Sequence, residues 1–459
     1  MLWIVLEVQD QTKRKDKIKN ELKSPVFRAF FLHLCSMEKL FDLFYDTTGV
    51  CTDTRNIIEN SLFVALKGNN FNANEFAQQA IYKGSKYAIV DDAKYANDST
   101  IFLVENSLLF LQKLANHHRS KFNIPIIGIT GSNGKTSTKE LINVVLSKKY
   151  HVLCTKGNLN NHIGVPLTLL QLTETHEIAI IEMGANKPFD IQELCDIAGP
   201  THGIITNIGK AHLEGFINFD GVFKTKTELY QSVIKKNGKI IVNSDDSILM
   251  KALSNNISSL SYGENGDIKG ELIELNPFIK LKWKYKSYES GEIQTNMLGK
   301  YNFYNFLAAI SFGILFDVDP SQINIAIANY EPKNNRSEIQ KTKKNTLIVD
   351  CYNANPSSMK SALESFSLIQ HTNKIAILGD MRELGNESQI EHQQVLNLCN
   401  DLNIEYFTIG EQFKVNNPTN GFYSKEDFVE YLKKSNLSEK LILLKGSRGI
   451  GLEELIPYL

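Results

Sequence analysis

One glycine-rich segment constrains the chain more than any other feature. IPIIGIT (residues 124–130) is typical of a buried strand, and GSNGKTSTKE (residues 131–140) leads from it into a predicted helix that ends near Lys148. Gly131 and Gly134 allow a tight turn and a close approach to an anion. Backbone N–H groups at a helix N-terminus attract phosphate oxygens. The segment therefore predicts a phosphate-binding loop between a strand and a helix.

The residue types in this loop favour ATP as the ligand. Lys135 is expected to reach the β and γ phosphates, and the Thr136 hydroxyl is expected to ligate Mg²⁺. Ile129 stands where the standard loop has Gly, so the loop belongs to a variant group. The alternative is a chance glycine-rich turn. The residues predicted to bind ATP here are Gly131, Ser132, Asn133, Gly134, Lys135, Thr136 and Ser137.

The composition is that of an ordinary globular chain. Its 459 residues favour two to four domains. A formal net charge of −1 gives no bulk attraction to nucleic acid or to an anionic membrane. Six scattered cysteines without a CxxC pair indicate a reduced, cytoplasmic protein. No apolar run is long enough for membrane insertion, so we expect a chain that is not inserted in a bilayer.

The first 36 residues differ from the rest. MLWIVLEV is a short apolar run that contains Glu7, and a charged stretch from Lys13 to Lys19 follows it. A signal peptide has the opposite order, with basic residues before the apolar region. We therefore expect residues 1–36 to be an extension outside the fold, with Met37 as an alternative start.

Three sections of the chain follow, each with its own pattern of strands and helices. Residues 37–121 contain short strand-like runs around a helical pattern at residues 74–84, which predicts a small α/β domain. Residues 122–332 alternate apolar strands with helices and favour a parallel sheet; within them, residues 255–297 resemble a β-rich insertion. Residues 333–459 repeat the alternation as a Rossmann-like domain. The predicted fold class is α/β with three domains.

Four further side chains are considered for chemistry. Glu182 ends a predicted strand at the carboxyl edge, where α/β sheets bind ligands, and its carboxylate could ligate Mg²⁺ or be solvated. His212 lies in a loop at the same predicted edge and is either a ligand or structural. Lys224 and Lys226 lie on a predicted helix, where lysines are usually solvated.

Several strings, in order along the chain, carry a resemblance to a known family. TGSNGKTS matches the loop shared by Mur ligases and folylpolyglutamate synthetases. Longer strings resemble the Mur ligases, and among them the members that add a dipeptide. These strings are GNLNNHIGVPLTLL (157–170), IEMGANKPFDI (181–191), PTHGIITNIGKAHLEGF (200–216), DCYNANPSSM (350–359), LGDMRELG (378–385) and KGSRGIGLE (445–453).

The resemblance implies roles around the nucleotide. Lys226 matches a family lysine that is carbamylated by CO₂ and then ligates a second Mg²⁺. The resemblance thus gives Lys135, Lys226 and His212 catalytic roles. The implied metal ligands are Thr136, Glu182, His212 and carbamylated Lys226.

The resemblance also implies contacts from later in the chain. Asn302 and Asn305 match residues that hold adenine, although Tyr301 replaces the usual His. Without the resemblance, these two Asn could simply cap a helix. Arg336 and Asp350 match nucleotide contacts from the third domain, and Cys351 stands where Ser is common.

Substrate contacts are implied in the first two domains. The first domain resembles the UDP-sugar domain of the family, with Thr54 and Arg55 as candidate contacts. Asn160 and Asn161 match a loop between the nucleotide and the substrates.

The implied activity is ATP-dependent formation of an amide bond. The resemblance implies a monomeric ligase that joins D-alanyl-D-alanine to UDP-N-acetylmuramoyl-tripeptide through an acyl phosphate, with ATP and two Mg²⁺ ions. One alternative is a sibling ligase or a folylpolyglutamate synthetase, which differs in substrate. The other is a nucleotide-binding regulatory protein, which would lack the lysine or the metal ligands.

Overall fold

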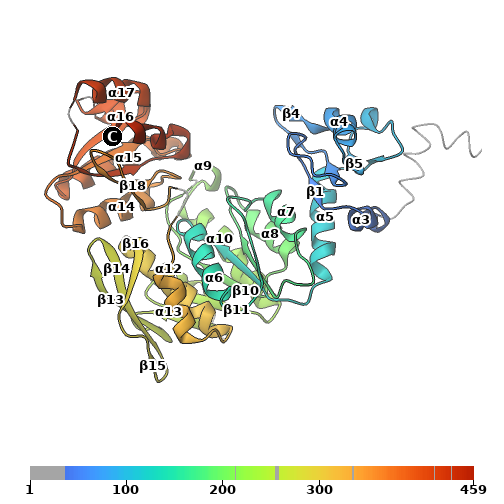
Figure 1. Ribbon diagram of the computed structural model, residues 1–459, viewed down its shortest axis with the longest axis horizontal. Helices are drawn as coiled ribbons and strands as arrows, with labels where there is room; N and C mark the ends of the chain where they lie inside the picture. Colours follow the sequence, from blue (N-terminus) through green and yellow to red (C-terminus); the bar gives the residue numbers. More distant parts are fainter. Residues whose placement is uncertain (1–36, 212, 254–257, 333–334, 418, 436) are drawn as a thin grey trace, which may run out of the picture. The chain divides into compact units, whose positions relative to one another are not determined.

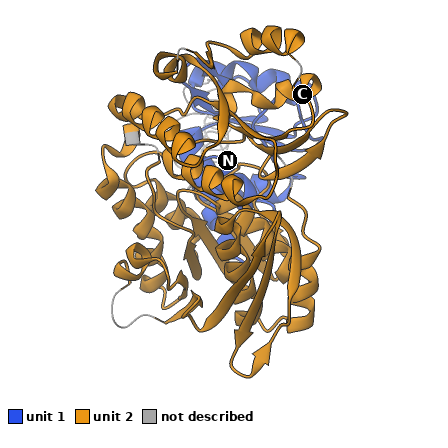
Figure 2. Ribbon diagram, turned by 90° about the vertical axis from the view of Figure 1, so that its left-hand side faces the viewer, with its two compact units in different colours: residues 1–123, 162–172 blue, residues 124–161, 173–459 orange. Residues whose placement is uncertain are grey.

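The computed structural model describes residues 37–459 apart from 212, 254–257, 333–334, 418 and 436. The expected extension, residues 1–36, lies outside the described residues. The described chain forms an α/β fold with separate sheets in its N-terminal, middle and C-terminal parts (Figure 1). Its described residues divide into two compact units, which are those up to 123 with 162–172 and those of 124–161 with 173–459 (Figure 2).

The larger sheet of the first unit is parallel and has the strand order β1-β2-β5-β6, and β3 and β4 form a separate antiparallel pair. Small and apolar residues of these strands are buried against α4 and its neighbours, as the alternation in the sequence predicts. Its elements are α3 (Met37–Tyr45), β1 (Val50–Cys51), β2 (Leu62–Val64), β3 (Lys67–Gly68), β4 (Phe71–Asn72), α4 (Ala77–Tyr82), β5 (Tyr87–Val90), β6 (Ile101–Leu103), α5 (Ser107–Ser120) and α7 (Gly164–Leu169).

The helix α7 belongs to the first unit although its residues lie between two strands of the middle sheet. It packs against α5. The His118 Nε2–H donates to the backbone oxygen of Leu172, with 3.0 Å between the two atoms. The sequence patterns did not indicate this return of the chain to the first unit.

The middle sheet has the strand order β15-β14-β13-β12-β11-β10-β7-β9-β8, with β16 beside β14. Its strands from β8 to β13 are parallel, and β13 to β16 pair antiparallel. The strands are β7 (Ile126–Thr130), β8 (Val152–Cys154), β9 (Ile178–Glu182), β10 (His202–Ile205), β11 (Lys239–Asn243), β12 (Ser259–Gly263), β13 (Ile268–Leu275), β14 (Phe278–Tyr285), β15 (Tyr288–Glu289) and β16 (Ile293–Leu298).

The alternation of side chains along β7 explains how helices cover both faces of this sheet. Ile127 and Ile129 face one core, which α6, α12 and α13 complete. Gly128 faces the other way, where a Cβ atom would lie 2.8 Å from the Leu229 side chain of α10. Helices here are α6 (Lys135–Leu146), α8 (Asp190–Ala198), α9 (Leu213–Phe216), α10 (Phe219–Lys235), α11 (Ser247–Lys251), α12 (Lys300–Leu315) and α13 (Pro320–Ala328).

The C-terminal sheet has the strand order β17-β18-β22-β19-β20-β21 and is parallel except for β17. Two cores, one on each face, give the doubly wound arrangement that the sequence predicts. Its elements are β17 (Glu338–Lys341), β18 (Thr346–Asp350), α14 (Pro356–Leu368), β19 (Lys374–Gly379), α15 (Ser388–Asp401), β20 (Glu405–Ile409), α16 (Glu411–Asn416), β21 (Gly421–Phe422), α17 (Lys425–Lys434) and β22 (Leu441–Lys445).

None of the helices in the described part of the chain combines the length and the apolar character that a bilayer span requires.

Candidate active site

The predicted phosphate loop connects β7 to α6. Gly131 has a φ of +148°, and a Cβ atom on it would collide with the Thr206 hydroxyl. Gly134 has a φ of +77° and is the N-cap residue of α6. Both positions require glycine because L side chains rarely adopt such angles. The loop geometry therefore agrees with the turn predicted from the sequence.

Part of the loop backbone is held by Asn207, which follows β10. Ser132 N–H donates to the Asn207 backbone oxygen at 2.9 Å, and Asn133 N–H donates to Asn207 Oδ1 at 3.0 Å. The first N–H groups of a helix lack an intrahelical acceptor. The N–H groups available to a phosphate are therefore those at the start of α6, namely Gly134, Lys135, Thr136 and Ser137.

Lys135 folds back over the loop. Its Nζ donates to the Gly131 backbone oxygen at 2.8 Å. Burial lowers the pKa of Lys135, the charge of Arg336 adds to this effect, and the charge of Glu182 opposes it. The Lys135 amine also lies 3.3 Å from the Ser132 backbone oxygen, so it lies over the phosphate loop itself.

Lys224 and Lys226 take opposite environments on α10. Lys224 is exposed and pairs with Asp220, with 2.7 Å between Nζ and Oδ2. Lys226 is only 1% exposed. Burial, with the nearby charge of Lys135, lowers the pKa of Lys226 well below its ordinary value. A neutral amine at this position can react with CO₂, which a protonated amine cannot.

The Glu182 carboxylate is buried at the end of β9. Its Oε1 accepts from Thr136 Oγ1 at 3.2 Å and from Asn160 Nδ2 at 2.8 Å. Its Oε2 lies 3.8 Å from Lys139 Nζ and has no hydrogen-bond partner among the described residues. A buried carboxylate oxygen beside a threonine hydroxyl is the kind of hard-oxygen donor that Mg²⁺ prefers.

The structure thus brings two predicted metal ligands, Thr136 and Glu182, into contact. His212 lies outside the described residues. Within the ranges that the structure describes, no group of three or more His, Cys, Asp and Glu side chains could hold a metal ion.

Asn302 and Asn305, the predicted adenine contacts, make internal hydrogen bonds at the start of α12. Asn302 Nδ2 donates to the Leu298 backbone oxygen at 2.6 Å, and Asn305 Nδ2 donates to Asn302 Oδ1 at 2.7 Å. Asn305 Oδ1 accepts from Thr138 Oγ1 of α6 at 2.9 Å. The N-cap residue of α12 is Gly299, without a side-chain cap hydrogen bond, so neither Asn has the capping role that the sequence left open. Their contacts link α12 to the phosphate-loop helix.

The predicted nucleotide contacts of the C-terminal part have partners of their own. The Arg336 guanidinium lies 3.8 Å from the centre of the Tyr352 ring. Asp350 Oδ2 lies 2.9 Å from Lys445 Nζ, and both side chains are largely buried. Tyr301 OH lies 2.7 Å from Ser337 Oγ.

The predicted substrate contacts lie in both units. In the first unit, Arg55 is exposed and pairs with Asp53, which lowers the pKa of that carboxyl to about 2. The Thr54 backbone oxygen accepts from Lys83 Nζ at 2.8 Å. In the second unit, Asn160 positions Glu182, and Asn161 is in the same loop.

Sequence reasoning missed several side chains that support this site. Lys139 is 2% exposed, donates to the Thr155 backbone oxygen at 2.8 Å and faces Glu182. The clue to Lys139 in the sequence was its position, four residues after Lys135 on a predicted helix. Asn207 lies just beyond the end of β10, and Glu182 is the last residue of β9, so the position of Asn207 near a strand end could have drawn attention to it.

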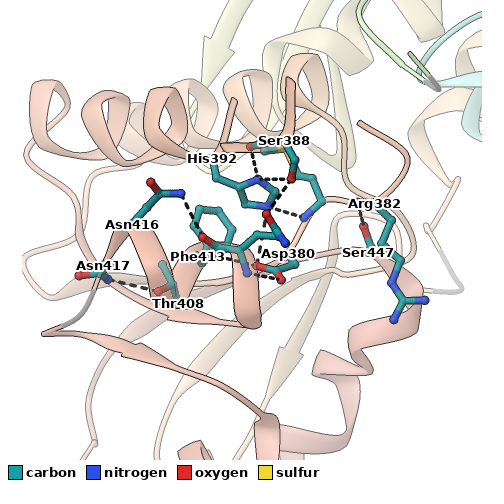
Figure 3. A network of polar contacts seen from close by, with 11 residues as sticks. Asp380, Arg382, Ser388, His392, Thr408, Phe413, Asn416, Asn417 and Ser447 are labelled. Carbon is teal, nitrogen blue, oxygen red and sulfur yellow. Dashed lines mark hydrogen bonds and ion pairs between the residues drawn. The ribbon is translucent and has the colours of Figure 1, made fainter. Parts of the chain in front are cut away.

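The LGDMRELG string forms a polar network with its neighbours (Figure 3). The Asp380 carboxylate caps α16 by accepting from the N–H groups of Gln412 and Phe413, each at 2.9 Å. His392 Nε2 accepts from Met381 N–H at 3.0 Å, so its Nδ1 carries the proton that is donated to the Ser388 backbone oxygen. This network fixes the loop after β19.

Comparisons with known proteins identify the family. Residues 129–313 match the Mur ligase middle domain, and residues 335–448 match the Mur ligase, glutamate ligase domain. The UDP-N-acetylmuramoyl-tripeptide--D-alanyl-D-alanine ligase of Bacillus subtilis is 33% identical over 431 residues, which cover 90% of this chain and 93% of the relative.

Solved structures give the same result. The crystal structure of MurF from Acinetobacter baumannii has a TM-score of 0.82 at 29% identity and covers 90% of this chain and 97% of its own. MurF ligase from Thermotoga maritima in complex with ADP has a TM-score of 0.81 at 26% identity and covers 91% and 97%.

The fold and the phosphate loop define an ATP-dependent α/β ligase. The chain belongs to the Mur ligase family.

Proposed function

We propose that the chain joins D-alanyl-D-alanine to UDP-N-acetylmuramoyl-tripeptide in the cytoplasm, as a step in peptidoglycan precursor synthesis, and that it acts as a monomer. The observation that carries this proposal is the similarity to the Bacillus subtilis ligase along nine-tenths of both chains. The phosphate loop and the buried Glu182 beside Thr136 support the use of ATP with Mg²⁺.

The reaction requires activation of a carboxylate. A carboxylate oxygen of the tripeptide attacks the γ-phosphorus of ATP, the bond to the bridging oxygen breaks, and ADP leaves. The amine of D-alanyl-D-alanine then attacks the acyl carbon, phosphate leaves, and the nitrogen loses a proton. Phosphoryl transfer of this kind depends mainly on positioning and on neutralisation of charge.

Residues at the edge of the middle sheet and at the start of α6 would provide this positioning and this neutralisation of charge. The N–H groups at the start of α6 hold the phosphates, and Lys135 neutralises their charge. Thr136 and Glu182 would hold Mg²⁺, with His212 and Lys226 at a second ion. Mg²⁺ bound there supplies positive charge beside the β and γ phosphates. The lowered pKa of Lys226 supports its carbamylation because the neutral amine is the form that adds CO₂.

The remaining contacts of the proposal lie elsewhere in the chain. Asn302 and Asn305 would lie near adenine, and Arg336 and Asp350 would reach the nucleotide from the C-terminal part. Thr54 and Arg55 would contact the uridine end of the substrate, and the loop of Asn160 and Asn161 would lie near the peptide.

The test is release of phosphate by the purified chain with Mg·ATP, UDP-N-acetylmuramoyl-tripeptide and D-alanyl-D-alanine. We expect release only when all three are present, and we expect Lys135→Ala to abolish it while the circular dichroism spectrum is unchanged. Phosphate release with a folate and glutamate instead would show a folylpolyglutamate synthetase. Substantial turnover by Lys135→Ala would contradict the mechanism.

A further inference from the structure

The Asn133 side chain points out of the phosphate loop toward the N-terminus of α14. Its Nδ2 donates to Ser357 Oγ at 2.8 Å, and its Oδ1 accepts from Asn355 Nδ2 at 2.8 Å. The backbone of Asn133 is also occupied, since its oxygen accepts from Thr206 Oγ1 at 2.6 Å. Asn133 therefore joins the loop on one side to β10 and on the other to α14.

The three side chains form a closed ring of hydrogen bonds. Ser357 Oγ, which accepts from Asn133, donates to Asn355 Oδ1 at 2.9 Å, and Asn355 donates back to Asn133. Asn355 is 6% exposed and also caps α14 by accepting from Ser358 N–H at 2.8 Å. Each donor in the ring has one acceptor, so the directions of all three bonds are consistent.

A second loop of the middle sheet meets the same point of α14. A Cβ atom on Gly209 would lie 2.8 Å from Ser357 Oγ, so a larger residue at this position would displace that hydroxyl. Gly209 N–H donates to Ser132 Oγ at 2.9 Å, and that hydroxyl donates to the Gly209 oxygen at 3.0 Å. The next residue, Lys210, lies 2.6 Å from the buried Glu391 carboxylate of α15.

We propose that Asn355 and Ser357 are positioning residues that hold the phosphate loop through Asn133, so that the loop takes its productive shape only when the N-terminus of α14 is docked on it. The inference rests on the proposed function only for its turnover assay. Because nucleotide binding uses the N–H groups at the start of α6, loss of the ring lowers kcat more than it weakens nucleotide binding.

Two adjacent serines of α14 give a matched pair for the test. Ser357→Ala removes the ring without removing the cap, whereas Ser358→Ala removes part of the capping box without touching the loop. We expect Ser357→Ala to lower kcat about tenfold, which corresponds to the loss of one hydrogen bond that leaves the half-buried Asn133 Nδ2 donor unpaired. We expect Ser358→Ala to keep kcat within about twofold while lowering the unfolding temperature.

A double-mutant cycle separates coupling from two independent effects. If the three side chains act as one ring, Asn133→Ala already removes its effect. The double variant Asn133→Ala/Ser357→Ala is then expected to have the same kcat as Asn133→Ala alone. The Kd for a nonhydrolysable ATP analogue, measured by calorimetry, is expected to change less than threefold in Ser357→Ala. Multiplicative effects of the two substitutions, or equal losses of kcat in Ser357→Ala and Ser358→Ala, would overturn the inference. An inactive wild-type chain that still binds the analogue would instead refute the proposed substrates.

Discussion

At the scale of single residues, burial separates two lysines that the sequence presents as neighbours on one helix. Lys224 is exposed and paired with Asp220, whereas Lys226 is buried with a lowered pKa. We expect Lys226→Ala to lower kcat by about 100-fold or more, because it removes a group that the proposed mechanism uses to stabilise charge. We expect Lys224→Ala to stay within about twofold of the wild type, because exposed ion pairs contribute little.

Steady-state phosphate release measures both lysine variants, and their circular dichroism spectra serve as the check on folding. Added bicarbonate provides a further readout, since carbamylation of Lys226 depends on dissolved CO₂. Equal activity of the two variants would remove Lys226 from the mechanism.

Residue patterns predicted some of this site and not the rest, for a physical reason. Gly131, Gly134 and Lys135 are constrained by local backbone geometry, which a short string records. Lys139 and Asn133 depend on partners far away in the chain, Glu182 and Ser357 respectively. No local pattern records such partners, so Lys139 was missed and Asn133 was expected only to bind ATP.

At the scale of elements, the network around the loop after β19 depends on a neutral histidine. Burial lowers the pKa of His392, and its Nε2 accepts from Met381 N–H. In the unfolded chain, His392 takes up a proton as the pH falls below the ordinary histidine pKa of about 6.5. In the folded chain, burial of the imidazole opposes this protonation. The stability that His392 provides is therefore complete above about pH 6.5 and is lost as the pH falls through the lower folded pKa.

Urea unfolding at pH 7 and pH 5 tests this pH dependence. We expect His392→Gln to lose about 1–3 kcal/mol at pH 7, because it leaves buried polar groups unpaired, and to lose less additional stability at pH 5 than the wild type does. His371→Gln is the control, since His371 is exposed. An unchanged pH difference in His392→Gln would show that other groups cause it.

Strand and helix patterns predicted the three α/β regions, and the comparisons confirmed the fold class and the family. The described part of residues 255–297 is rich in strands, as expected for a β-rich stretch. β12 pairs in parallel with β11, so these strands extend the middle sheet itself. A strand pattern gives the element and its faces, whereas its neighbour in the sheet is set by packing across the chain.

At the scale of the whole molecule, the first compact unit is built from two separate stretches of chain. The sequence predicted one continuous domain at residues 37–121, whereas the first unit also includes residues 162–172. Val165 and Leu169 of α7 are buried, and α7 packs against α5. The first unit therefore depends on residues that follow the phosphate loop.

A fragment of residues 37–123 is consequently expected to be less stable than the same fragment joined through a flexible Gly/Ser linker to residues 162–172. Burial of two apolar side chains of this size stabilises a fold by roughly 3–6 kcal/mol, and the His118 hydrogen bond to Leu172 adds to that. Urea unfolding followed by circular dichroism measures the difference, and the linked fragment should unfold cooperatively at the higher urea concentration. A linked fragment in which Val165 and Leu169 are replaced by Ser provides the control, because it has the same length without the apolar contacts. If all three fragments unfold at the same urea concentration, α7 is not part of the folding unit, and the first unit is continuous, as the sequence patterns alone predict.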